Sequence, residues 1–439
     1  MDGFIREVER ITSLLDSASR VEQTIRGGPH GDYELYGNCL KNIAEAETYL
    51  RTDGASFKAA GTIVAHLERL KVIGQEKCDE SLVNLLSKAS TPVTPSQILS
   101  QVDTSVPLDE LALPEARVPL SKDKLKEISV LSEALSSCPG VYQVRWIKEY
   151  LQRRSAFLVQ SLQAYQVERA FQEFIDNRKA KGDRLQPFIE LLLMFLPLVQ
   201  GERLLAQKIL LRDWKGGYAA VIEPAVDFVT ESGETLLKLY AAVSIFLRFP
   251  LLNVLQFFSR IQAHLKALFN SPETSKYLID LENLRGQVQG RMKVSLAQVS
   301  ESIRSSHDPI RDSGTVDQLT SNVITFLVNI EHHQASVDQM LPAVEQRKGE
   351  TGNSPFAVYL NTVLEDLLTA IVSKANAEKS VPLKSVYAMN NIKYMVLKLL
   401  KSSLSTIISA ALLEKAEKQL LHFRGTYKAS YVPHRLDLV

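Results

Sequence analysis

Apolar side chains recur every three or four positions along most of the chain, which is the period of an amphipathic α-helix. Alternating β-branched residues between Asn-Gly or Asp-Gly turns, the pattern typical of β-hairpins, are missing. Helix breakers are scarce, with 20 glycines and 17 prolines among 439 residues. No repeat of the length found in helical solenoids is visible. The pattern therefore predicts an all-α protein built from consecutive helical bundles.

Turn-rich stretches divide this helical pattern into four parts. We predict an N-terminal coil helix at 1–26, a first helical bundle at 27–210, a second at 211–345 and a partial third at 346–439. The helical pattern is clearest over the segments 35–50, 57–88, 122–136, 141–176, 185–211, 221–230, 234–247, 251–269, 272–305, 355–374, 382–401 and 402–423.

Capping residues predict where two of the helices begin. In the proline-rich connection 91–119, Ser96 would cap a short helix at 96–102. Thr315, with Gln318 three positions later, has the arrangement of a capping box and predicts the start of a second helix. The apolar face of that second helix would consist of Val316, Leu319, Val323, Phe326, Leu327 and Ile330.

The first helix carries an apolar seam with the spacing of a coiled coil. Phe4, Val8, Ile11, Leu15 and Ala18 are separated by 4, 3, 4 and 3 positions, and charged residues lie between them. The seam is short, so two interpretations stay open: a coil with another protein, or a first bundle helix that packs on its own domain. We take these five residues as the candidate partner-binding site.

Charge and cysteine content narrow the classes of function. The net charge of +1 is far from the basic footprint of a nucleic-acid binder, so no nucleic-acid partner is expected. Cys39, Cys78 and Cys138 are far apart and form no CxxC pair, which argues against disulfides or a zinc site and favours inert buried thiols. The most apolar stretch, 188–199, is too short to span a bilayer. A soluble, cytoplasmic protein is expected.

Residue constellations for catalysis are absent from the sequence pattern. The dipeptide Gly-Lys never occurs, which excludes the phosphate-binding loop that ends in Gly-Lys-Ser/Thr. His332 and His333 are adjacent and therefore point about 100° apart on a helix, so they are predicted to lie on a solvated face rather than to share a metal. Glu365 and Asp366 are likewise predicted to be solvated rather than a catalytic pair. We expect no enzyme activity, no metal and no cofactor.

One basic cluster remains as a candidate contact surface. Arg178, Lys179, Lys181 and Arg184 lie in a glycine-containing loop, and four basic residues are at the low end of what attracts phosphoinositides. Contact with a membrane or an acidic partner is one interpretation of this loop. A plain solvated loop is the favoured one.

The predicted capped helix carries a resemblance to a known family. Residues 313–322, Ser-Gly-Thr-Val-Asp-Gln-Leu-Thr-Ser-Asn, followed by Phe326-Leu327, resemble a segment of the seventy-kilodalton subunit of the exocyst, from which Ser313 and Asp317 depart. Weaker matches run in the same order along nearly the whole chain, to about Tyr427. They include 25–31, 66–95, 142–145, 154–155, 359–374 and 390–394 with its paired asparagines.

This resemblance implies a function. It implies an elongated rod of helical bundles within the exocyst, a non-enzymatic complex that tethers secretory vesicles to the plasma membrane. It further implies partners among the other exocyst subunits, joined through the N-terminal coil, together with Rho-type small GTPases and a phosphoinositide membrane surface. The location would be cytoplasmic, peripheral at exocytic sites of the plasma membrane.

The ends of the chain depart from that family. The N-terminal coil is shorter, and Tyr431-Val432-Pro433-His434 stands where the family's helix would continue. No position corresponds to the family's lipid-binding C-terminal patch, so we expect the C-terminal part to be lacking and phosphoinositide binding to be weakened. The alternative hypothesis is a peripheral membrane or Rho-type GTPase effector adaptor that acts outside the complex.

Overall fold

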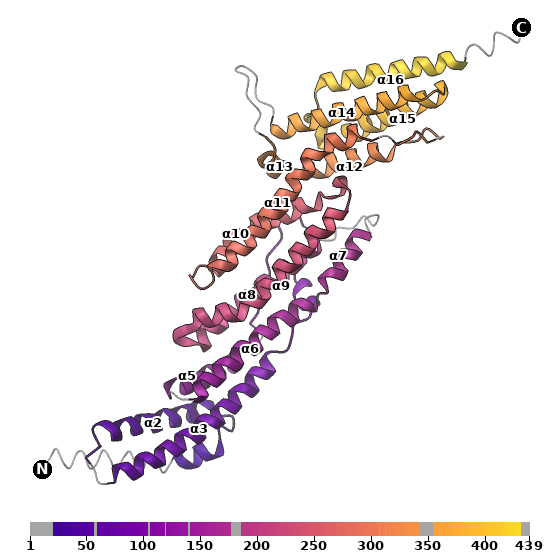
Figure 1. Cartoon of the computed structure of the whole chain (residues 1–439). Helices are drawn as coiled ribbons and strands as arrows, with labels where there is room; N and C mark the ends of the chain where they lie inside the picture. Colours follow the sequence, from indigo (N-terminus) through magenta and orange to yellow (C-terminus); the bar gives the residue numbers. More distant parts are fainter. Residues whose placement is uncertain are drawn as a thin grey trace, which may run out of the picture. The chain divides into compact units, whose positions relative to one another are not determined.

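The computed structural model confirms the prediction of an all-helical chain. It describes residues 21–56, 59–103, 106–118, 120–138, 141–176, 186–306, 308–311, 313–342 and 354–431, and these residues contain helices and no strand (Figure 1). Residues 21–27 are helical. The later helices are α2 (Tyr33–Thr52), α3 (Ala60–Ala89), α4 (Pro95–Leu99), α5 (Lys122–Ser137), α6 (Val141–Gln163), α7 (Val167–Asp176), α8 (Pro187–Ile209), α9 (Trp214–Ala242), α10 (Pro250–Leu268), α11 (Ser275–Arg304), α12 (Gln318–Glu331), α13 (Gln334–Met340), α14 (Pro355–Ala377), α15 (Val381–Leu400) and α16 (Ala410–Tyr431). Three short 3-10 turns, Leu211–Asp213, Ile245–Leu247 and Ser403–Thr406, lie between them.

The chain forms two compact units. The first comprises Met1–Val106, Leu111–Ser232 and Ala263–Asp280, and the second comprises Pro107–Glu110, Gly233–Gln262 and Leu281–Val439. The division into a coil helix and three bundles that the sequence indicates stays a prediction.

In the first unit, the connection between α4 and α5 crosses α8 at a proline. Pro197 lies inside α8, and the backbone N–H of Arg117 donates to the carbonyl of Pro197 at 2.9 Å. One turn further along α8, a Cβ atom on Gly201 would overlap the carbonyl group of Arg117. The absence of a side chain at Gly201 therefore allows the backbone of the connection to lie directly on the helix.

A buried ion pair joins three elements of the first unit. Arg154 on α6 and Glu202 on α8 are both almost fully buried, and Nε of Arg154 donates to the carboxylate at 3.1 Å. Nη1 of the same guanidinium donates to the carbonyl of Ala89 at 2.8 Å, at the end of α3. The Phe157 ring lies 4.1 Å from the guanidinium carbon. These partners satisfy a charge that would otherwise be costly to bury.

The short helix α4 begins one position earlier than the sequence indicates. Thr94, not Ser96, precedes its first residue, Pro95. The backbone N–H of Thr94 donates to the side chain of Gln97 at 3.1 Å, which is one half of a capping box. Proline is favoured at the first helical position because its missing N–H would have no partner there, and this preference moves the start to Pro95.

Two helices predicted at 221–230 and 234–247 form one continuous helix, α9, which is followed by a 3-10 turn at Ile245–Leu247. Ser232 and Gly233, which lie between the two predicted segments, are inside this helix. A Cβ on Gly233 would overlap the side chain of Leu284 from α11, so this glycine permits a close approach of two helices rather than a turn.

In the second unit, α14, α15 and α16 pack side by side, and α12 packs on α15 and α14 (Figure 1). The helix α14 is long and apolar enough to cross a membrane by length and composition alone. Its apolar residues Leu360, Leu364, Leu367 and Ile371 are buried within the unit. Core helices of soluble proteins pass the same test, and α14 packs as a core helix of the second unit.

The crossing at Gly201 generates a prediction. Replacing Gly201 with alanine should lower the free energy of unfolding of the first unit by about 1–3 kcal/mol, because the new methyl group must displace the backbone of the connection. Urea denaturation followed by circular dichroism measures the change. Gly61→Ala is the matched control, since Gly61 lies in α3 with nothing within 4 Å of the added Cβ, and helix propensity there favours alanine. Equal stabilities for the two variants would show that the connection does not rest on α8 in solution.

Candidate functional site

Both contact surfaces predicted from the sequence lie outside the described residues. These are the seam of Phe4, Val8, Ile11, Leu15 and Ala18 and the basic loop of Arg178, Lys179, Lys181 and Arg184. Both therefore stay predictions. The recognisable segment 313–322 is described, and it is the starting point for the candidate site.

The loop before α12 is held by the paired asparagines of α15. Gly314 has a φ of +59°, and a Cβ there would lie 3.0 Å from the side chain of Val386, so glycine suits both the backbone angle and the space. Nδ2 of Asn390 donates to the carbonyl of Gly314 at 2.8 Å. Nδ2 of Asn391 donates to the carbonyl of Thr315 at 3.4 Å, and its Oδ1 accepts from the N–H of Asp317 at 2.8 Å. The two asparagines thus bind backbone groups along the loop.

Asp317 is the centre of this arrangement, which we call the Asp317 joint: Asp317, Lys374, Tyr387, Asn390 and Asn391. Its carboxylate accepts a hydrogen bond from Lys374 of α14, another from the Tyr387 hydroxyl at 3.1 Å, and a third from the N–H of Leu319 at 3.4 Å. Burial opposes ionisation of Asp317, but these hydrogen bonds and the charge of Lys374 together outweigh it, so the pKa of this carboxyl is lowered. Burial, reinforced by the neighbouring Asp317, raises the pKa of Tyr387.

The prediction that Thr315 caps α12 is wrong. The N-cap is Asp317, whose side chain accepts from the N–H of Leu319, and α12 begins at Gln318. Aspartate is as good a capping residue as threonine, so a signal for the true start was present directly before Gln318. The partner Lys374 lies 57 positions away, and no local pattern connects it to Asp317. The joint connects α12, α14 and α15, and its polar groups form their hydrogen bonds within the joint and with the loop before α12.

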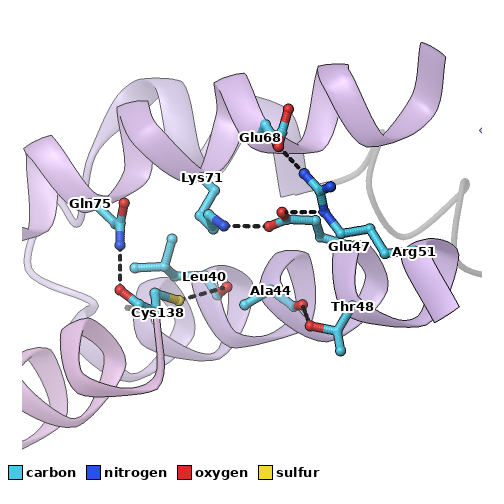
Figure 2. Close-up of polar contacts among 9 residues, drawn as sticks. All are labelled: Leu40, Ala44, Glu47, Thr48, Arg51, Glu68, Lys71, Gln75 and Cys138. Atoms are coloured by element: carbon cyan, nitrogen blue, oxygen red, sulfur yellow. Dashed lines mark hydrogen bonds and ion pairs between the residues drawn. The ribbon is translucent and has the colours of Figure 1, made fainter. Parts of the chain in front are cut away.

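A second polar cluster lies in the first unit, between α2 and α3 (Figure 2). Glu47 is mostly buried and accepts hydrogen bonds from Lys71 and from Arg51, the latter at 3.0 Å; Arg51 also pairs with Glu68. Burial works against ionisation of Glu47, but the bonds from Lys71 and Arg51 outweigh it and lower the pKa of the carboxyl. The cluster joins two helices, and its charged groups are paired with one another rather than directed toward a substrate.

The three thiols are buried, as predicted. Burial raises the pKa of Cys138 to about 11, and it raises those of Cys39 and Cys78 as well. A nucleophilic cysteine needs a lowered pKa, so these thiols are inert at neutral pH.

The two histidines differ from each other. His332 is exposed, as predicted. His333 is partly buried, and this burial, followed by the nearby His332, lowers the pKa of its imidazole to about 4. The prediction of a solvated face is therefore wrong for His333, because this residue lies at the junction of α12 and α13 rather than on the outside of a helix. Over the described ranges, no group of three or more His, Cys, Asp or Glu is placed to hold a metal ion.

The two acidic residues of α14, Glu365 and Asp366, are both predicted to be solvated, and the structure confirms this for Glu365 alone. Glu365 is exposed, as predicted. Asp366 forms two hydrogen bonds with Arg304 of α11, at 3.2 and 3.0 Å. Asp366 therefore connects two helices, and the two adjacent carboxylates do not act as a pair.

Comparisons with known proteins give one consistent result. Residues 186–433 match the family model for the C-terminal part of the Exo70 component of the exocyst complex. Exocyst complex component 7 of Dictyostelium discoideum is 23% identical over 356 residues, covering 79% of this chain and 40% of that protein. Exocyst complex component EXO70A1 of Arabidopsis thaliana is 20% identical, covering 98% of this chain and 70% of the relative. Exocyst complex component 7 of Homo sapiens is 26% identical, covering 51% and 32%.

Solved structures share the fold. The Exo70 structure of S. cerevisiae has a TM-score of 0.65 at 12% identity and covers 95% of this chain and 79% of its own. A second structure of the same yeast component has a TM-score of 0.64, with 95% and 84% covered. The chain spans less than half the length of the Dictyostelium and human relatives and 70% of the Arabidopsis one.

The Asp317 joint predicts an acid-dependent stability. Because the pKa of Asp317 is lowered in the folded state, its contribution is present above the ordinary carboxyl pKa near 4 and is lost as pH falls through the lower folded value. Asp317→Asn should cost about 1.5–3 kcal/mol at pH 7 and little at the acid end of this window. Denaturation curves at a series of pH values measure both. Asp308→Asn, in the exposed loop nearby, is the control; a loss at pH 7 as large as that of Asp317→Asn would contradict the joint.

Asp79 of α3 predicts a dependence of stability on pH that is opposite to that of Asp317. Its carboxylate is buried, accepts no hydrogen bond from the described residues, and has an ion pair with the exposed Arg145 at 3.3 Å. Burial raises its pKa, although Arg145 opposes the shift. The charged form therefore destabilises the fold once pH rises above the ordinary carboxyl pKa. Asp79→Asn should raise the free energy of unfolding at pH 7 by about 1–2 kcal/mol, and the gain should vanish toward pH 4. A loss of stability at neutral pH, measured by urea denaturation, would show that the ion pair outweighs the cost of burial.

Proposed function

The chain belongs to the family of Exo70 exocyst complex subunits, and on that premise we propose that it is a subunit of the exocyst complex that works as a non-enzymatic scaffold. In this role it contributes helical surfaces to a complex that tethers secretory vesicles to the plasma membrane. The observation that carries the proposal is the family match over 186–433, more than half of the chain.

The chemistry of the described residues supports a scaffold. The buried charges are used to join helices: Arg154 to Glu202, and Lys374 to Asp317. The thiols have raised pKa values, and the partly buried His333 is neutral at physiological pH. Groups of these kinds stabilise helices against one another and leave the exposed faces to bind partners.

The partners proposed are the other exocyst subunits. The seam of Phe4, Val8, Ile11, Leu15 and Ala18 has the spacing that a helix of another subunit would complement. The protein would then be cytoplasmic and peripheral at exocytic sites of the plasma membrane. Rho-type small GTPases and phosphoinositides are further partners that the family implies, and the basic loop at 178–184 is the candidate contact for acidic groups.

Affinity purification of the tagged full chain from its own cells, with partners identified by mass spectrometry, tests the function. Recovery of several other exocyst subunits is the expected result. A folded, helical chain that recovers none of them would mean that it shares the family's ancestry and fold but acts elsewhere.

The seam generates its own prediction. Ile11→Asp should abolish recovery of the other subunits, because a charge at the centre of an apolar helix interface is not compensated there. Helicity measured by circular dichroism should stay unchanged. Ser13→Asp, which places the same charge two positions away and off the seam, is the matched control and should leave recovery intact. If both variants recover partners normally, the seam packs within its own domain.

A further inference from the structure

One side of helix α15 carries exposed leucines together with lysines. Leu397 and Leu400 are 46% and 50% exposed and lie three positions apart, so they are neighbours on one face of the helix. Lys393, four positions before Leu397, and Lys401, four positions after it, are exposed on the same face. We call these four residues the α15 strip. The strip extends over about two helical turns.

The other sides of α15 are covered by its neighbours in the second unit. α16 and α14 pack along it, and α12 also packs on it, with the hydroxyls of Ser321 and Tyr394 3.3 Å apart. The buried residues of α15, among them Ile392, Met395 and Leu399, form this covered part. The strip therefore lies on the side of α15 that no described helix of the second unit covers.

The lysines of the strip have a net positive environment. Lys374 of α14 and Lys418 of α16 both form ion pairs with carboxylates, but Lys393 and Lys401 form none with the described residues. Residues 354–431 contain ten lysines and arginines and only five aspartates and glutamates, although the full chain is nearly balanced. Charge complementarity therefore favours an acidic occupant for the strip.

The surface of α15 suits a helix better than an extended segment. The backbone groups of α15 are bonded within the helix, so they cannot pair with the N–H and C=O groups of an extended segment. A helix satisfies its own backbone groups and can place an apolar stripe against Leu397 and Leu400. Acidic residues beside that stripe would then lie near Lys393 and Lys401.

A lipid surface fits the strip less well than a helix. Helices that bind at a membrane surface bury a long apolar face, in which Trp, Phe and Leu are common. The strip offers two leucines and no aromatic residue. Its apolar part has the size of a contact between two helices.

We propose that the α15 strip is a docking surface for an acidic amphipathic helix of another protein. The apolar stripe of that helix packs on Leu397 and Leu400, and its carboxylates pair with Lys393 and Lys401. The open side of α15 is then covered as its other sides are. This inference does not depend on the assignment to the exocyst, because it rests on the chemistry of one helix face.

A labelled synthetic peptide tests the proposal with the full chain. The probe is a fluorescein-labelled peptide of about 18 residues built from alanine, leucine and glutamate, with leucines every three or four positions and glutamates beside them. Fluorescence polarisation should show binding that weakens as the salt concentration rises. Replacing Leu397 and Leu400 together with glutamine should weaken this binding at least about tenfold. Replacing Lys393 and Lys401 together with glutamate should do the same.

The matched control changes the same kinds of side chain outside the strip. Val358→Gln combined with Lys379→Glu alters one exposed apolar and one exposed basic residue of the second unit, and it should leave the affinity unchanged. Circular dichroism should show the same helicity for all three double variants, since each replaces exposed side chains. No peptide binding, binding that the strip variants leave unchanged, or an equal loss in the control would overturn the proposal.

Vesicles that contain anionic lipid are the second probe. Peptide binding that depends on the strip supports the proposal, with or without vesicle binding. Sedimentation of the chain with the vesicles, lost in the strip variants and without any peptide binding, would assign the strip to a membrane surface and overturn the proposal.

Discussion

The side chain of Asn391 imposes the strongest constraint on the second unit. It is fully buried, so its carboxamide must find hydrogen-bond partners inside the protein. It finds them in the carbonyls of Tyr387 and Thr315 and in the N–H of Asp317. The bonds to Thr315 and Asp317 can form only when the loop before α12 lies against α15. This buried amide, together with that of Asn390, therefore holds the loop that leads into α12 against α15, beside the place where Asp317 meets Lys374.

The first unit meets the same constraint with charges. An all-helical chain has no β-ladder to fix the register of its elements, so the register depends on side chains. Leucine against leucine tolerates small displacements, but a guanidinium that must reach one carboxylate and one carbonyl does not. Arg154 reaches Glu202 on α8 and the carbonyl of Ala89 at the end of α3. The pair is costly to bury, and its value lies in specifying which turns of the helices face one another.

The sequence predicts that the helices exist, but it does not predict the side-chain contacts that connect them. The three-to-four period alone identified nearly every helix, because that signal is carried by many residues at once. Errors occurred where a single distant contact decides. Gly233 lies between two predicted helices, but it is inside α9, where the absence of a side chain leaves space for Leu284. His333 follows an exposed residue, but the junction of two helices partly buries it. The sequence does not show whether Asp79 lies on the exposed or the buried face of its helix. Only the packing of the unit shows that its carboxylate is buried without a hydrogen bond from the described residues, which is costly in free energy.

The resemblance and the physical analysis lead to different parts of the molecule. The segment that most clearly identified the family, 313–322, is occupied in holding α12, α14 and α15 together. Its polar groups bond to one another, so a partner would gain little by binding there. Gly314 and the backbone groups bound by Asn390 and Asn391 belong to this internal constraint, although Asp317 itself departs from the family's pattern. A surface that binds a partner has fewer contacts within its own chain to restrict its sequence. The only sequence signal of the seam at 4–18 is the spacing of its apolar residues. The family therefore follows from the interior of the protein, and the choice of partner must follow from residues that the interior does not constrain.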